Sequence, residues 1–108
     1  MRFVAASYAL GDGVKKNEQR ARKWYARAAK AGDLTSDFDL AMMLLYGEGG
    51  SVELERGKVL LEEAAEKGEP MAQKVLAYAY KDSMFGFPID NKRAEHWKKL
   101  AEAQGMNV

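Results

Sequence analysis

The chain offers few side chains of the kinds that perform catalytic chemistry. It has one histidine, His96, and no cysteine, which excludes a thiol nucleophile, a disulfide framework and a multi-histidine metal site. A general base works beside a second polar group, and none is recognisable near His96, so we interpret it as a surface histidine. Glu62 and Glu63 are adjacent. Because neighbouring residues on a helix point about 100° apart, their carboxylates do not converge.

Two further patterns could bind a phosphate or a cation, and both are incomplete. The turn Gly47-Glu48-Gly49-Gly50 is rich in glycine, but no strand precedes it and no Lys-Ser/Thr pair follows it, which argues against a phosphate site. The acidic residues of the turns, Asp12, Glu48, Asp82 and Asp90, are too scattered to form a calcium loop. The sequence therefore predicts a protein that is not an enzyme and that has no catalytic residues, metal ligands or cofactor.

The composition is that of one soluble domain. The 108 residues are 47% hydrophobic and 31% charged, with only 2 prolines, and helix-forming residue types dominate. No apolar run approaches the roughly 18 residues that span a membrane, so no membrane partner is predicted. The segment from Met1 to Leu10 is too short and too lightly charged for a secretory leader. We expect a cytoplasmic protein, or a periplasmic one if a leader has been removed upstream.

A sequence phrase recurs three times, with its landmark glycines Gly32, Gly68 and Gly105 spaced by 36 and 37 residues. The first copy reads Arg20-Ala21-x-x-Trp24-Tyr25-x-x-Ala28-Ala29-x-x-Gly32. The second reads Arg56-Gly57-x-x-Leu60-Leu61-x-x-Ala64-Ala65-x-x-Gly68. The third reads Arg93-Ala94-x-x-Trp97-x-x-x-Ala101-x-x-x-Gly105. A repeat period of this length is typical of solenoid proteins.

The spacing of apolar residues in these phrases predicts helices. In the first copy they fall at i, i+3, i+4, i+7 and i+8, which makes one stripe on an α-helix. The glycine that ends each phrase favours a left-handed helix end, Asp33 is placed to cap the next helix, and Pro70 suits a first turn. We predict helices over about 2–10, 17–31, 34–46, 53–67, 70–82 and 91–104.

The predicted fold is all-α, an α/α superhelical solenoid of about three helix-turn-helix repeats of 36–37 residues. We expect a single repeat domain over residues 1–108. Its units are about 1–32, 33–68 and 69–105, and the first unit lacks the beginning of its first helix. Roughly three stacked units are the smallest number expected to be stable.

The repeated residues resemble the Sel-one-like (SLR) repeats, which are α/α relatives of the tetratricopeptide repeats. The first copy matches the family pattern at Tyr8, Gly11, Gly13, Val14, Arg20, Ala21, Trp24, Tyr25, Ala28, Ala29 and Gly32. The third matches at Ala72, Leu76, Ala77, Tyr80, Gly86, Arg93, Ala94, Trp97, Ala101 and Gly105. The second is looser, with departures at Leu44, Gly50 and Gly57. The resemblance implies a protein-binding adaptor with a concave surface lined by the first helix of each unit.

Candidates for partner contact are the residues of that surface that lie outside the apolar stripes. Phe38 and Met42 lie one helical turn apart, and Lys74 and Tyr78 occupy the equivalent positions 36 residues later. One interpretation is a groove with an apolar middle flanked by a lysine. The other is that the apolar members belong to the core, because most apolar side chains at such positions are buried.

The turn of the third unit departs most from the repeat pattern. Ser83-Met84-Phe85-Gly86-Phe87-Pro88 replaces the tight Gly-x-Gly turn with a longer and more apolar loop. Phe85 and Phe87 either cover the core of the last unit or form an exposed contact patch, since aromatic residues are enriched at interfaces.

Charge is unevenly divided along the chain. The balance is +5 over residues 1–36, −6 over 37–69 and +2 over 70–108, for a net charge of +1. The predicted outward residues of the second helix are Arg20, Arg22, Lys23, Arg27 and Lys30, and those of the fourth are Glu53, Glu55, Glu62, Glu63 and Glu66. Such ridges are either solvated surfaces with weak ion pairs between helices or a dipolar outer face that orients a partner. The near-neutral total does not support a nucleic-acid partner.

Two binding roles follow from these observations. The first is a non-catalytic adaptor or scaffold that holds a protein partner on its concave repeat surface. The second, by analogy with small bacterial proteins that carry such repeats, is an immunity or inhibitor protein that blocks a secreted toxin or enzyme. Solenoid ends usually need a polar outer face, and the short first helix and short tail supply little of one. A homo-oligomer formed through the uncapped repeat ends is therefore also predicted.

Overall fold

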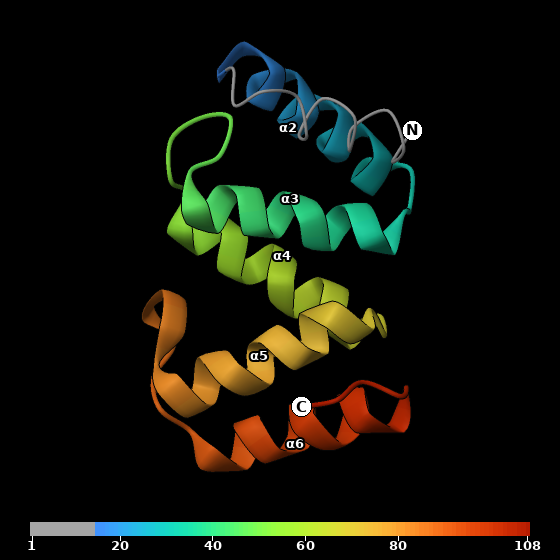
Figure 1. Ribbon diagram of the computed structural model, residues 1–108, viewed down its shortest axis with the longest axis vertical. Coiled ribbons are helices and arrows are strands. Elements are labelled where there is room, and N and C mark those ends of the chain that lie inside the picture. Colours follow the sequence, from blue (N-terminus) through green and yellow to red (C-terminus); the bar gives the residue numbers. More distant parts are fainter. Residues whose placement is uncertain (1–14) are drawn as a thin grey trace.

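The computed structural model describes residues 15–108 and contains five α-helices and one short 3-10 turn over that range (Figure 1). No strand occurs in the described part, so the all-α prediction is confirmed. The helix predicted over 2–10, together with the turn at Gly11 and Gly13, lies outside the described residues. The elements are α2 (Lys15–Lys30), α3 (Leu34–Tyr46), α4 (Leu54–Glu66), α5 (Pro70–Asp82), η1 (Met84–Gly86) and α6 (Asn91–Ala103).

The helix ends follow from local sequence signals. Gly32, Gly68 and Gly105 have φ values of 96°, 97° and 85°, the left-handed conformation that glycine adopts at little cost. The Asp33 side chain accepts hydrogen bonds from the backbone N–H groups of Thr35 and Ser36, which confirms it as the N-cap of α3. At the equivalent position before α5, Glu69 accepts from the Ala72 N–H at 2.7 Å. The predicted bounds of the described helices hold to within two residues, whereas η1 was not predicted.

The helices form hairpins that stack along the long axis of the molecule, whose described part measures 40 × 25 × 23 Å (Figure 1). Each helix packs mainly on the next along the chain, so α3 lies between α2 and α4, and α5 lies between α4 and α6. In repeat terms α3 and α5 are the first helices of the second and third units. The second helices of the three units are α2, α4 and α6. No described helix is both long and apolar enough to cross a bilayer.

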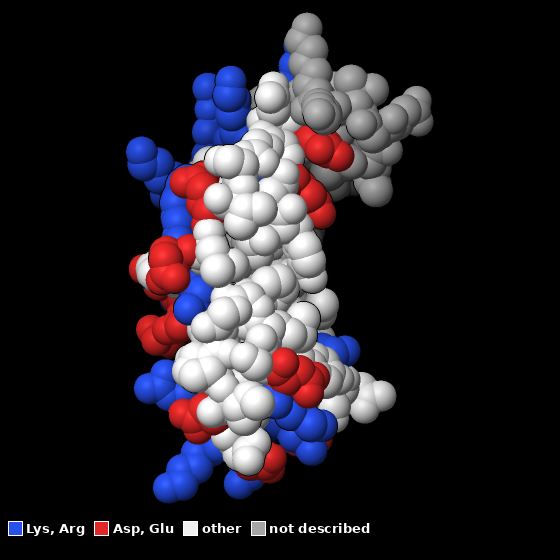
Figure 2. Space-filling view, turned by 90° about the vertical axis from the view of Figure 1, so that its left-hand side faces the viewer, with Lys and Arg blue, Asp and Glu red and all other residues white. Residues whose placement is uncertain are grey.

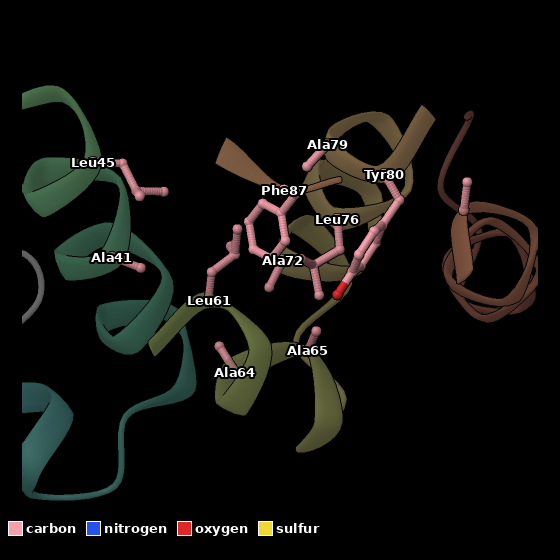
Figure 3. Close-up of a cluster of buried hydrophobic side chains, with 11 residues drawn as sticks. Ala41, Leu45, Leu61, Ala64, Ala65, Ala72, Leu76, Ala79, Tyr80 and Phe87 are labelled. Carbon is pink, nitrogen blue, oxygen red and sulfur yellow. The ribbon is translucent and has the colours of Figure 1, made fainter. Parts of the chain in front are cut away.

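The core runs through the stack as two clusters of apolar side chains. One lies between α2 and α3, and the larger one joins α3, α4, α5 and the segment after η1 (Figure 3). Gly57 of α4 lies where α3 and α4 approach each other closely, because a Cβ built there would meet Leu45 side-chain carbons at 2.8 Å and the Ala41 carbonyl oxygen at 3.2 Å. The departure from alanine at this repeat position therefore has a packing reason.

The outermost described helix, α6, carries polar residues where the inner second helices carry apolar ones. Tyr25 of α2 and Leu61 of α4 are buried, and the equivalent residue of α6 is the half-buried Lys98. Likewise Ala65 is 1% exposed, whereas its counterpart Glu102 is exposed. The expectation of an apolar end surface is therefore not met at α6, because charged side chains replace the core residues that would face a further helix.

Candidate functional site

The four predicted contact residues of the first helices lie at equivalent positions on α3 and α5. Phe38 and Met42 are half-buried and pack with one side against the larger core cluster. Lys74 is also half-buried, and Tyr78 is 36% exposed. Phe38 and Met42 therefore belong in part to the core, as the second interpretation predicts, and they still leave surface exposed. We call these four residues the α3–α5 face.

A cavity of about 290 Å³ adjoins the α3–α5 face where α5 meets α6. Tyr78 forms part of its wall, together with the small side chains of Ala77 and Ala94. Lys81 and Lys98 add positive charge to the same wall, and Glu95 adds a carboxylate. The cavity is thus lined by small apolar side chains with a few charged groups among them.

The two phenylalanines of the η1 loop have different environments. Phe87 is 2% exposed and packs edge-on against Tyr80 with ring centroids 5.0 Å apart. Of the two alternatives predicted for this loop, Phe87 therefore covers the core and is not part of an exposed patch. Phe85 is half-buried and packs edge-on against Tyr46 at 5.4 Å. Its φ of 55° is a strained value for an aromatic residue. This pair joins the turn ends of the second and third units.

An exposed apolar strip lies along the turn side of the stack and was not found from the sequence. Its members are Tyr46 at 56%, Val52 at 57% and Ile89 at 66% exposure, with Leu54 and Met84 less exposed. Figure 2 shows this side of the molecule with a continuous uncharged surface down its middle. The strip has no helical periodicity, because its residues come from helix ends and turns, and so no pattern in the sequence could reveal it.

Arg22 corrects one prediction about the basic ridge of α2. Instead of pointing into solvent, its side chain is 15% exposed. It donates from Nε to the Glu48 carbonyl at 2.9 Å and from Nη2 to the carbonyls of Ser51 at 3.1 Å and Met43 at 3.2 Å. Its Nη1 also pairs with the Glu53 carboxylate at 3.4 Å. Arg22 therefore fastens the turn of the second unit to α2, and the sequence could not show this because the acceptors are carbonyls 21 to 29 residues away.

Lys58 occupies the same repeat position one unit later and makes the equivalent contact. Its Nζ lies 3.5 Å from the Gly86 carbonyl and 4.8 Å from the centroid of the Phe87 ring. Arg22 of α2 thus reaches the turn of the second unit, and Lys58 of α4 reaches the turn of the third unit in the same way. These residues have structural roles and are not candidates for partner contact.

The titratable side chains do not assemble into a catalytic arrangement in the described range. His96 is exposed as predicted, with its ring 5.0 Å from that of Trp97. Burial raises the pKa of the Asp37 carboxyl, with the positive charge of Lys67 acting against this shift and Glu63 and Asp33 adding to it. The described residues contain no group of three side chains suited to a metal ion.

Comparison with known proteins gives the family. The Sel1 repeat model matches residues 1–33, 36–69 and 70–106. A Sel1 repeat protein from Oxalobacter formigenes is similar in structure, with a TM-score of 0.86 and 30% identity, over 96% of this chain and 42% of its own. A protective antigen of uropathogenic Escherichia coli strains, which displays an SLR fold, has a TM-score of 0.84 and 28% identity, over 97% of this chain and 22% of its own. The chain thus spans less than half the length of either protein, and it belongs to the Sel1 repeat family.

Proposed function

We propose that the chain is a non-catalytic adaptor that holds a protein partner on the α3–α5 face. Sel1 repeats are generally protein–protein interaction modules, so the protein class of the partner rests on the family. The observation that carries the choice of face is the partial exposure of Phe38, Met42 and Tyr78, of which Met42 and Tyr78 occupy the same repeat position. Apolar side chains that already pack on a rigid core lose little rotamer freedom when a partner covers them, which favours binding.

The cavity beside Tyr78 supports the same face. A partner segment that crosses α3 and α5 would meet apolar surface at Met42 and then reach a recess with lysines at its rim. Buried apolar contacts at the centre with charged groups around them are the usual anatomy of a protein interface. We therefore expect the partner to place an apolar side chain near Tyr78.

Site-specific photocrosslinking tests the choice of face. A photoreactive amino acid placed at position 42 or 78 should capture the same protein from a cell extract. The same amino acid at the exposed position 99, on α6, should not capture it. Capture from position 99 alone would overturn the assignment. Measuring the activity of the captured protein with and without the chain distinguishes a scaffold from a toxin-blocking role, because only the blocking role abolishes that activity.

A variant pair checks that the captured protein binds through these side chains. Met42→Glu combined with Tyr78→Ala should abolish binding of the captured protein to the full chain, because it removes apolar contact area and adds an unpaired charge to the face. Far-UV circular dichroism should show unchanged helicity. Since Met42 also packs on the core, Tyr78→Ala alone is the second variant, and undiminished binding of the captured protein by both variants would contradict the proposal.

A further inference from the structure

The outer helices α2 and α4 present opposite charges side by side. Lys23, Arg27 and Lys30 are exposed on α2, and Glu63 and Glu66 are exposed on α4. In Figure 2 the second helices form the left edge, where blue side chains at the level of α2 give way to red ones at the level of α4. A groove of about 380 Å³ separates the two helices, and Leu40 and Leu60 contribute apolar atoms to it.

The ion pairs of the described residues do not include these charges, and on the α2 ridge the Arg27 guanidinium lies over the Trp24 ring, 5.5 Å from its centroid. The cations near α4 are paired locally, with Arg56 3.6 Å from Glu53, Lys58 4.0 Å from Glu55 and Lys67 3.9 Å from Asp37. Among the described residues, no ion pair includes the three exposed cations of α2 or the carboxylates of Glu63 and Glu66. Within residues 15–108, the one ion pair between α2 and the start of α4 is that of Arg22 with Glu53, the residue that precedes α4. Intramolecular pairing therefore does not account for the two ridges.

The repeat spacing puts the opposite charges in register. Arg27 and Glu63 are 36 residues apart, as are Lys30 and Glu66, so each pair occupies one repeat position. The helices α2 and α4 run in the same direction (Figure 1), so each pair lies at the same height along its helices. A rotation of 180° about an axis along the groove exchanges the places of α2 and α4 while it preserves that height. The C-terminal halves of the two outer helices are thus complementary to themselves under a two-fold rotation, whereas Arg20 and Arg56, which also share a repeat position, carry like charges.

We propose that this outer surface binds a second copy of the chain as a symmetric dimer. In the dimer α2 of each copy lies against α4 of the other, and Arg27 and Lys30 of one copy face Glu63 and Glu66 of its partner. Every contact occurs twice, as a two-fold interface requires. Charge complementarity of this kind sets the register of an interface and speeds its formation. The dimer uses a different surface from the α3–α5 face, which stays open to a protein partner.

Salt dependence of self-association is the first test. Sedimentation equilibrium of the full chain should give a dimer whose dissociation constant rises at least about tenfold between about 50 mM and about 500 mM salt, because mobile ions screen exposed charges. A strictly monomeric chain at low salt, up to the highest soluble concentration, would overturn the proposal. So would a dimer whose dissociation constant does not respond to salt.

Charge reversal on one helix at a time gives a sharper test. The variant Arg27→Glu with Lys30→Glu makes both outer helices acidic, and the variant Glu63→Lys with Glu66→Lys makes both basic. Each variant alone should be monomeric, because its copies repel one another. An equimolar mixture of the two should restore a dimer that contains one copy of each, since positions 27 and 30 of each copy again face positions 63 and 66 of opposite sign in the other.

The control variant carries the same change of charge on α6. Lys92→Glu with Lys99→Glu alters exposed residues that lie outside the proposed interface, and it should dimerise as the unmodified chain does. Circular dichroism of each variant shows whether it folds. The proposed interface is contradicted if the two variants fold but remain monomeric when mixed. It is also contradicted if the α6 control loses the dimer, because a change of net charge alone would then explain the loss.

Discussion

At the scale of single residues, Arg22 shows how one side chain can fix the turn of a neighbouring repeat. Its guanidinium reaches three backbone carbonyls and one carboxylate, and a planar group with several fixed donors is suited to such a task. Gly50 fits the same arrangement, because a Cβ there would meet Arg22 Nη1 at 2.8 Å. The glycine that replaces the valine of the family pattern therefore makes room for the arginine.

Arg22→Ala should lower the free energy of unfolding by about 2 kcal/mol, because it removes hydrogen bonds from a charged donor and leaves carbonyls without partners. The neighbouring variant Lys23→Ala changes an exposed residue and should stay within about 0.5 kcal/mol of the unmodified chain. Urea unfolding followed by circular dichroism measures both. Equal stabilities of the two variants would show that the Arg22 contacts contribute nothing net.

Asp37 gives a pH dependence whose sign follows from burial. Since burial raises the pKa of the Asp37 carboxyl in the folded state above its ordinary value, the folded state holds the proton more tightly than the unfolded state does. The stability that this carboxyl contributes is present below the unfolded pKa and is lost as the pH rises through the folded pKa. As the pH rises from about 3 to about 6, the free energy of unfolding of Asp37→Asn should therefore increase relative to that of the unmodified chain, because asparagine does not titrate.

Urea unfolding over that pH range tests the Asp37 prediction. Lys67→Met provides a second variant, because Lys67 lies 3.9 Å from the Asp37 carboxylate and its charge lowers the pKa. Its loss should make the decline in stability with pH steeper. Parallel pH profiles for Asp37→Asn and the unmodified chain would contradict the assignment of the slope to this carboxyl.

At the scale of elements, the packing of α3 on α4 depends on Gly57. Helix propensity alone predicts that Gly57→Ala stabilises the chain by about 1 kcal/mol. We expect the opposite sign, a loss of about 1 to 3 kcal/mol, because the added Cβ would crowd Leu45 and the Ala41 carbonyl oxygen. Thermal or urea unfolding decides between the two. Combining Gly57→Ala with Leu45→Ala should cost less than the sum of the single changes, since the second removes the close contact with the Leu45 side chain and leaves only that with the Ala41 carbonyl oxygen.

Local signals explain why the helices and their ends could be predicted from the sequence. A left-handed glycine, an N-cap such as Asp33 and an apolar stripe at helical spacing each act over one or two turns. The environments of Arg22, Phe87 and Lys98 could not be predicted in this way. Each environment depends on how one unit packs against the next. The sequence of the loop, with a phenylalanine on each side of Gly86, does not distinguish a buried side chain from an exposed one.

At the scale of the whole molecule, the net charge of +1 conceals an ordered arrangement of charges. Stacking units with a period of about 36 residues places the basic α2 beside the acidic α4 on the outer side, while α3 and α5 carry the half-exposed apolar residues. The position of the α3–α5 face could be predicted because repeat positions align. The identity of the partner could not, because the side chains on that face define only an apolar surface with lysines around it.

The affinity of the captured partner for the α3–α5 face is the most direct measurement of the central claim. Titration calorimetry should give a dissociation constant at least about tenfold higher for Tyr78→Ala than for the unmodified chain, since truncation of a central aromatic contact commonly costs more than 1 kcal/mol. The control Lys99→Ala, on the exposed side of α6, should leave the dissociation constant unchanged. Equal affinities for Tyr78→Ala and the unmodified chain, with the partner still bound, would contradict the assignment of this face.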